Sequence, residues 1–263
     1  MKRELPAPAP ATPSPPEREP WDTLRRHTAA RIGLARTGAS LATAPLLDFR
    51  LAHARARDAV HEPLDDARLR AELATLSLPV LALASAAESR EQYLMRPDLG
   101  RRLRPDDIAA LAAHAGSYDV AFVVADGLSA RAVETHARPL LAETLPPLRA
   151  EGWRVAPLVV VHHGRVAIGD AVAAALGADI VAMLIGERPG LSAPDSMGAY
   201  LTWHPTVATT DAERNCISNI RPEGLRYGDA AFTLVHLLRA MRRRRLSGVA
   251  LKDDGARLSI EGR

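Results

Sequence analysis

The residues with the clearest potential for binding chemistry lie in a short loop over residues 186–192, which reads GERPGLS. Its two glycines allow the backbone to approach a ligand closely, and Pro189 stiffens the turn between them. The Glu187 carboxylate could therefore point at the occupant of a crevice beside the loop. Glu187 and Arg188 could equally be solvated charges, because functional sites and ordinary turns both occur in such loops.

A second candidate is the tight turn Asp126–Ser129, which follows a strongly apolar run. This turn could contact a ligand, although Ser129 could also simply cap the helix that begins after it. Val166 lies in a third turn, within the sequence GRVAIGD. The residues alone predict one ligand crevice lined by the Asp126–Ser129 turn, Val166, Glu187 and Cys216, and they leave the ligand unnamed.

Other patterns that could carry chemistry are weak. His162 and His163 are adjacent instead of four residues apart on a helix, and no third ligand lies nearby, so we expect no metal site. Cys216 has no local histidine to activate it, and a lone cysteine is more often a packed side chain than a nucleophile. The sequence contains no Walker motif, no G-x-G-x-x-G after a strand and no G-x-S-x-G.

The elements around these turns read as an α/β fold. Leu158–Val161 and Asp179–Ile185 are apolar runs typical of buried strands. Between them we expect a helix over Ala171–Leu176, with Asp170 as its N-cap and Gly177 ending it. Such a βαβ unit makes its two strands parallel. Loops that leave the carboxyl ends of parallel strands converge on a crevice, which is where the candidate turns would lie.

Further apolar and amphipathic runs extend this fold. Leu78–Ala84 and Asp119–Ala125 read as buried strands, and Thr206–Asp211 and Glu213–Ile220 make a further strand and loop. Helices are predicted over Pro105–Ala115, from Ser129 through Pro139, and over Tyr227–Arg245. The predicted class is α/β, with a parallel sheet and helices on both faces.

The chain divides by composition into three parts. Residues 1–20 are rich in proline and alanine and are predicted to be a disordered leader. Residues 21–76 are predicted to form a helical docking region for another subunit, with helices over Trp21–Thr37, Pro45–His61 and Leu64–Leu76. Charged, alanine-rich helices of this kind are also compatible with plain solvated surfaces. Residues 77–263 would form the α/β domain.

Composition excludes several classes of protein. A net charge of +3 over 263 residues gives no overall field for nucleic acid. No stretch approaches the roughly 20 apolar residues that span a bilayer, and the leader lacks the apolar core of a signal peptide. The single cysteine excludes an internal disulfide and suits a reducing cytoplasm.

Several long runs resemble the small (light) subunit of ethanolamine ammonia-lyase. They include SREQYLMRPDLGRRL, LIGERPGLSAPDSMGAYLTWHP and ERNCISNIRPEG, and together they extend over nearly all the chain after about residue 20. The resemblance implies a Rossmann-like (flavodoxin-like) domain that closes over adenosylcobalamin at an interface with a large subunit, a TIM barrel that holds the substrate. The implied reaction converts ethanolamine to acetaldehyde and ammonia by radical chemistry in the cytoplasm, and enclosure in a bacterial microcompartment is one alternative location.

The family's cofactor contacts carry over onto Val166, Glu187 and Cys216. The resemblance implies that Glu187 accepts hydrogen bonds from corrin amide groups and that Val166 packs against the cofactor or binds it through its backbone. It implies no catalytic residue and no metal ligand in this chain. The Asp-x-His-x-x-Gly signature is absent, which agrees with a family that keeps dimethylbenzimidazole on cobalt.

Two other functions are compatible with the sequence. One is a non-catalytic module that carries cobalamin or a nucleotide without a barrel partner. The other is a self-sufficient hydrolase that uses Cys216 as its nucleophile, and it predicts that Cys216→Ser abolishes the activity of the isolated chain.

Overall fold

The computed structural model describes residues 20–252. The leader predicted over residues 1–20 lies outside the described residues, apart from its last position. The chain divides into two compact units, one reaching to Arg50 and the other starting at Leu51, and helix α2 (Thr43–His61) runs through the boundary. Among residues 20–252, no helix has the length and apolar character needed to cross a membrane.

The first unit contains less helix than the sequence predicts. Helix α1 covers only Pro20–Arg25, and a short hairpin of β1 (Arg36–Thr37) and β2 (Ser40–Leu41) follows, so the predicted helix over Trp21–Thr37 is wrong. The Arg25 guanidinium donates to the carbonyl oxygens of Ile32 and Gly33, which brings the chain back along α1. Gly33 has φ +54°, a left-handed conformation that interrupts a helix.

The second unit is built on a six-stranded sheet with the order β3-β5-β4-β6-β7-β8. Strands β3 (Val80–Ala84), β5 (Leu158–His162), β4 (Tyr118–Ala125) and β6 (Ala178–Gly186) are parallel. Strands β7 (Met197–Trp203) and β8 (Asn215–Ile220) each pair antiparallel with the preceding strand. The α/β class is confirmed, but the sheet is mixed and not purely parallel. The segment between β6 and β7 contains no helix, so the chain makes no crossover and must return antiparallel.

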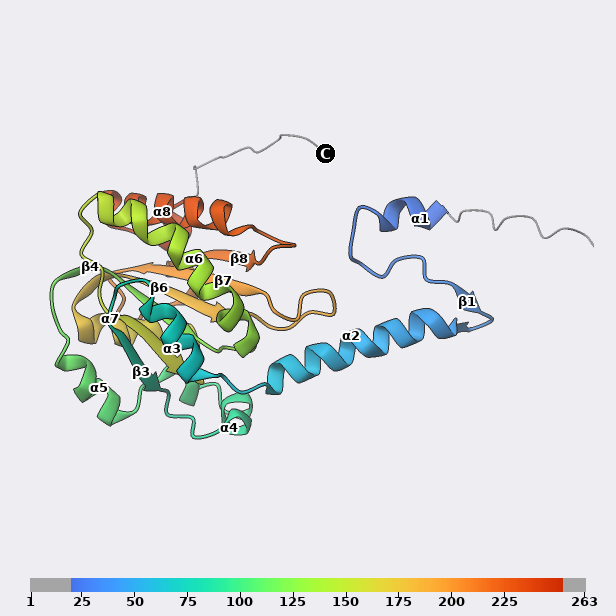
Figure 1. Ribbon diagram of the computed structural model, residues 1–263, viewed down its shortest axis with the longest axis horizontal. Helices are drawn as coiled ribbons and strands as arrows, with labels where there is room; N and C mark the ends of the chain where they lie inside the picture. The colour runs from blue at the N-terminus through green and yellow to red at the C-terminus, as the bar shows by residue number, and fades with distance from the viewer. Residues whose placement is uncertain (1–19, 253–263) are drawn as a thin grey trace, which may run out of the picture. The chain divides into compact units, whose positions relative to one another are not determined.

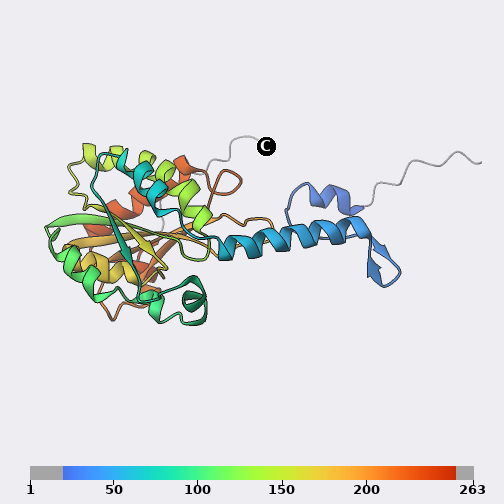
Figure 2. The ribbon, with the colours of Figure 1, turned by 60° about the horizontal axis from the view of Figure 1, so that its bottom comes forward.

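Helices cover both faces of this sheet, as Figures 1 and 2 show. Helices α5 and α7 pack with one apolar core, and α3, α6 and α8 pack with the other. Strand β4 explains the division, because Val120, Phe122 and Val124 point into one core and the alternate residues point into the other. The helix bounds are α3 Asp66–Ala74, α4 Arg90–Met95, α5 Pro105–Ala112, α6 Ala130–Ala150, α7 Ile168–Leu176 and α8 Tyr227–Arg244, with 3-10 turns at Leu99–Arg101, Asp211–Glu213 and Gly248–Ala250.

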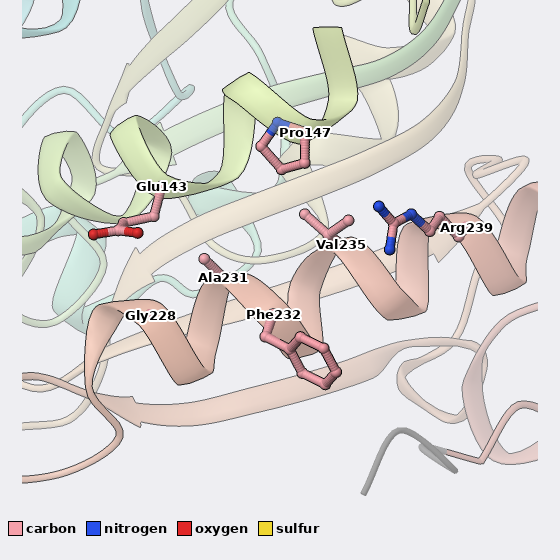
Figure 3. A pocket seen from close by; sticks show the side chains of 7 residues that line it. All are labelled: Glu143, Pro147, Gly228, Ala231, Phe232, Val235 and Arg239. Carbon is pink, nitrogen blue, oxygen red and sulfur yellow. The ribbon is translucent and has the colours of Figure 1, made fainter. Parts of the chain in front are cut away.

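A shallow groove of about 240 Å³ runs between α6 and α8 (Figure 3). Glu143 and Pro147 line it from α6, and Phe232, Val235 and Arg239 line it from α8. The sequence places Phe232 on the apolar face of α8, yet its side chain is among the exposed large hydrophobic residues.

A buried histidine on the α6 side predicts a pH dependence of stability. His136 is 1% exposed, its Nδ1 lies 2.7 Å from the Tyr227 hydroxyl, and its Nε2 lies 3.8 Å from the Asp195 carboxylate. Burial lowers the pKa of His136 below its ordinary 6.5, against the raising effect of Asp195. The unfolded chain therefore binds a proton at His136 more readily than the folded chain. The contribution of the neutral His136 side chain to stability is complete above about pH 6.5, and it is lost as the pH falls below that value.

We expect His136→Gln to flatten the fall in the free energy of unfolding between pH 7 and pH 5, measured by urea denaturation at each pH. His204→Gln is the matched control, because the His204 side chain is 72% exposed. An unchanged slope in His136→Gln would contradict the assignment.

Candidate functional site

The carboxyl ends of β4 and β5 meet at one edge of the sheet. The chain leaves β4 through α6 to reach β5, and leaves β5 through α7 to reach β6, so the two connections use opposite faces. Connections that diverge in this way open a crevice between the two strands. Asp126, at the end of β4, is 2% exposed and ties the walls together. Its carboxylate accepts hydrogen bonds from the Gly164 N–H and the Arg90 guanidinium, both at 3.2 Å.

The turn after β4 contributes backbone atoms and the Leu128 side chain to the site. Its two polar side chains, Asp126 and Ser129, form hydrogen bonds with other loops. Burial raises the pKa of the Asp126 carboxyl, against the lowering effect of Arg90. Ser129 stands at the N-cap position of α6, but its hydroxyl donates to the Pro194 carbonyl and makes no cap hydrogen bond. Asp126 and Ser129 therefore hold loops together, and Gly127 and Leu128 are the residues that line the crevice.

A buried tyrosine fixes the loop after β5. The Tyr93 ring lies between two guanidinium groups, 5.0 Å from Arg90 and 4.2 Å from Arg165, and its hydroxyl donates to the Gly164 carbonyl at 3.3 Å. Arg165 also donates to the Tyr93 carbonyl at 3.2 Å. These contacts hold Gly164 and Arg165, the two residues before Val166, in one conformation. The role of Tyr93 could not be predicted from the sequence, because its contacts with Gly164 and Arg165 join segments far apart in the chain.

Two adjoining cavities form the site, and we call them together the sheet-edge groove. A cavity of about 450 Å³ is lined by the ends of β4 and β6, including Glu187. A cavity of about 620 Å³ is lined by the start of β8, including Cys216. Both share the side chains of Arg165, Val166 and Tyr200. Val166, Glu187 and Cys216, which come from three separate segments, therefore all line the sheet-edge groove.

The Glu187 carboxylate is extensively hydrogen-bonded within the chain. Ser218 donates its hydroxyl to Oε1, while the Ser196 hydroxyl and the Asn219 N–H, at 3.2 Å, donate to Oε2. A carboxylate offers about four lone-pair positions, so Glu187 keeps about one for a ligand. Its main effect is to tie the β6–β7 loop to β8.

Cys216 lies within β8, whereas the predicted run Thr206–Asp211 before it contains no strand. The register partner of Cys216 on β7 is Tyr200, so the two side chains are neighbours on one face of the sheet. Desolvation raises the pKa of the Cys216 thiol, and the nearby Glu187 carboxylate raises it further, against the lowering effect of the Tyr200 hydroxyl. The neutral thiol is a poor nucleophile, which argues against the hydrolase reading.

His162, the last residue of β5, and His163, which follows it, have partners other than a metal ion. His162 Nε2 lies 3.3 Å from Asp66, and His163 Nδ1 lies 3.3 Å from the Ala87 carbonyl. In the part of the chain that the structure describes, no three His, Cys, Asp or Glu side chains gather in a way that could hold a metal ion.

Comparison with known proteins identifies the family. The family model described as "Ethanolamine ammonia-lyase light chain" matches residues 18–252. The chain belongs to the ethanolamine ammonia-lyase light chain family. A protein of Azotobacter vinelandii named ethanolamine ammonia-lyase small subunit is 55% identical, over 95% of this chain and 94% of that protein. The proteins of the same name from Ralstonia nicotianae and Pseudomonas fluorescens Pf-5 are 54% and 56% identical, over 92% and 89% of this chain and 91% and 87% of theirs.

Membership in the ethanolamine ammonia-lyase light chain family confirms the resemblance found in the sequence. It also makes this chain a subunit of a carbon–nitrogen lyase, and a small subunit implies a partner subunit.

Proposed function

We propose that this chain is the small subunit of an adenosylcobalamin-dependent enzyme that converts ethanolamine to acetaldehyde and ammonia. The chain holds the cofactor in the sheet-edge groove, and the large subunit holds the substrate. One observation carries the proposal: Val166, Glu187 and Cys216, the positions implied to contact the cofactor, line two adjoining cavities that share Val166, although they come from three segments.

The groove residues fit this cofactor. Cobalamin has a flat macrocycle with apolar faces, a rim of amide groups and a phosphodiester. Val166, Ile185 and Tyr200 offer surfaces that can pack against the macrocycle. Arg101 lines the larger cavity, and the buried Nε of Arg165 has no hydrogen-bond acceptor among the described residues. These guanidinium groups suit amide carbonyls or a phosphate oxygen.

The division of labour between the subunits follows from the cofactor's chemistry. Bound adenosylcobalamin supplies a radical by homolysis of its cobalt–carbon bond. This chain would bind the cofactor, orient it and exclude water from one side, while the partner subunit covers the other side. Residues 77–263 would then be a Rossmann-like cobalamin-binding domain, an interpretation supported by the four parallel strands and the helices on both faces.

We also propose that residues 21–76 dock on the large subunit. Exposed apolar side chains on α1 and α2 support this role, because large apolar groups left in water commonly mark an interaction surface. They are Trp21, Leu24, Leu47 and Leu51.

Reconstitution tests the proposed reaction. The chain is mixed with its large subunit, adenosylcobalamin and ethanolamine, and acetaldehyde is measured with an aldehyde-coupled assay. We expect acetaldehyde from the mixture and none from either chain alone. A silent mixture, together with tight cobalamin binding by this chain alone, would favour the carrier module instead.

A further inference from the structure

A buried ion pair lies in the wall of the sheet-edge groove. Arg214 is 8% exposed and Asp170 is 5% exposed. The guanidinium donates to both carboxylate oxygens, through Nη1 at 2.7 Å and Nη2 at 2.6 Å. Nη1 also donates to the Thr202 hydroxyl at 3.0 Å, and Nε lies 3.4 Å from the Asp211 carboxylate. The pair is therefore bidentate, desolvated and held in one geometry.

The ion pair joins the segments that carry the groove residues. Asp170 lies in the first turn of α7, one helical turn after Val166, and Arg214 lies two residues before Cys216. Thr202 lies two residues after Tyr200 on β7, so its side chain is on the same face of the strand. One guanidinium thus connects the walls that carry Val166, Cys216 and Tyr200.

Asp170 is not the N-cap that the sequence predicts. Helix α7 begins at Ile168 with Ala167 as its N-cap, and the Asp170 carboxylate instead reaches across to Arg214. Stability alone is a weak reason for such an arrangement, because burying two charges costs about as much as their attraction returns, and apolar residues of similar volume often serve as well. What the pair does provide is a fixed distance and angle between the two walls.

We propose that Asp170 and Arg214 are positioning residues that set the separation of the Val166 and Cys216 walls, and so the fit of the cofactor in the sheet-edge groove. This inference rests on the proposed function. The two residues act through the groove walls, and Arg214 additionally borders the larger cavity.

The test uses the complex of this chain with its large subunit and the double variant Asp170→Leu/Arg214→Met. Replacing both charges by apolar groups avoids an unpaired buried charge, so the variant should fold. Arg214→Lys is the second variant, because it keeps the charge and loses the bidentate fork. Glu151→Leu/Arg239→Met is the matched control, since that ion pair has side chains 36% and 46% exposed and lines neither cavity of the groove.

Two readouts separate positioning from stability. The first is the KM for adenosylcobalamin against kcat, and the second is the rate at which Cys216 is alkylated in the cofactor-free complex, followed by mass spectrometry of its peptide. Both Asp170/Arg214 variants should raise KM at least tenfold with kcat changed less than twofold, and should change the alkylation rate at least fivefold. The control should match the wild-type complex.

Several results would overturn the inference. If the double variant has wild-type KM and alkylation rate, the pair does not position the walls. If the alkylation rate of Cys216 changes while the KM for adenosylcobalamin does not, the walls move without affecting the fit of the cofactor, and the inference is also wrong. If the wild-type complex binds no cobalamin, the proposed function fails and the inference fails with it.

Discussion

Replacing Val166 with tryptophan should remove adenosylcobalamin binding from the complex while leaving the fold intact. Val166 is half-buried and lines both cavities of the sheet-edge groove, so an indole at this position would occupy the space that the two cavities share. We expect the affinity to fall by roughly 100-fold or more, which corresponds to about 2.8 kcal/mol. The free energy of unfolding should change by about 1 kcal/mol or less, because the new side chain projects from a rim and not from a core. Visible-absorbance titration and urea denaturation measure the two quantities.

The control for this prediction is Val249→Trp. Val249 is 83% exposed in the last 3-10 turn and lines neither cavity, so its substitution should leave the affinity unchanged. Wild-type affinity in Val166→Trp would mean that the cofactor lies elsewhere.

Replacing Gly186 with alanine should cause a large loss of stability. A Cβ on Gly186 would lie 2.5 Å from the Asp126 carbonyl oxygen and closer still to that of Ser129. Both atoms belong to the backbone of a buried turn that hydrogen bonds hold in place, so neither can move cheaply. Overpacking of this kind costs about 3 kcal/mol or more.

Gly228→Ala is the matched control, because a Cβ at Gly228 meets nothing within 4 Å. Gly228 lies in the first turn of α8, where alanine should stabilise the helix by up to about 1 kcal/mol. Urea denaturation of the two variants should therefore give shifts of opposite sign. Equal stability of Gly186→Ala and the wild-type chain would mean that β4 and β6 are less tightly joined than the structure indicates.

The sequence was sufficient to predict the helices and strands whose signals lie within the element itself. Runs such as Asp119–Ala125 are apolar on both faces, so their burial in the centre of a sheet follows from composition alone. The C-cap of α7 is also local, because Gly177 has φ +73°, which glycine adopts readily. The antiparallel direction of β7 could not be predicted from local signals. It follows because the β6–β7 connection contains no helix, and a loop rich in glycine and proline does not indicate the direction of the strand after it.

In the first unit, the pattern of charged residues was not sufficient to predict a helix correctly. The arginine-rich stretch after Trp21 has no apolar stripe to pack, and a helix without tertiary packing is marginal in water. Arg25 instead donates to carbonyl groups further along the chain, and α1 ends there. No spacing in the sequence marks that contact, which joins residues seven and eight positions apart.

The site was predictable as a set of positions but not as a set of contacts. Glu187 was visible as a charge in a glycine loop, while its partner Ser196 lies at the far end of that loop and its partner Ser218 lies in β8. The position of Asp170 near the start of the predicted helix is typical of an N-cap. The signal that could have corrected this reading is that Asp170 is the only charged residue in the apolar helix IGDAVAAAL, so it required a cationic partner if buried.

The most direct test of cofactor binding in the sheet-edge groove is a visible-absorbance titration of adenosylcobalamin against this chain, against the large subunit, and against the two together. We expect the mixture to bind the cofactor far more tightly than either chain, because the sheet-edge groove would cover one side of it and the partner would cover the other. Binding by the large subunit alone with the affinity of the mixture would contradict the assignment of the groove.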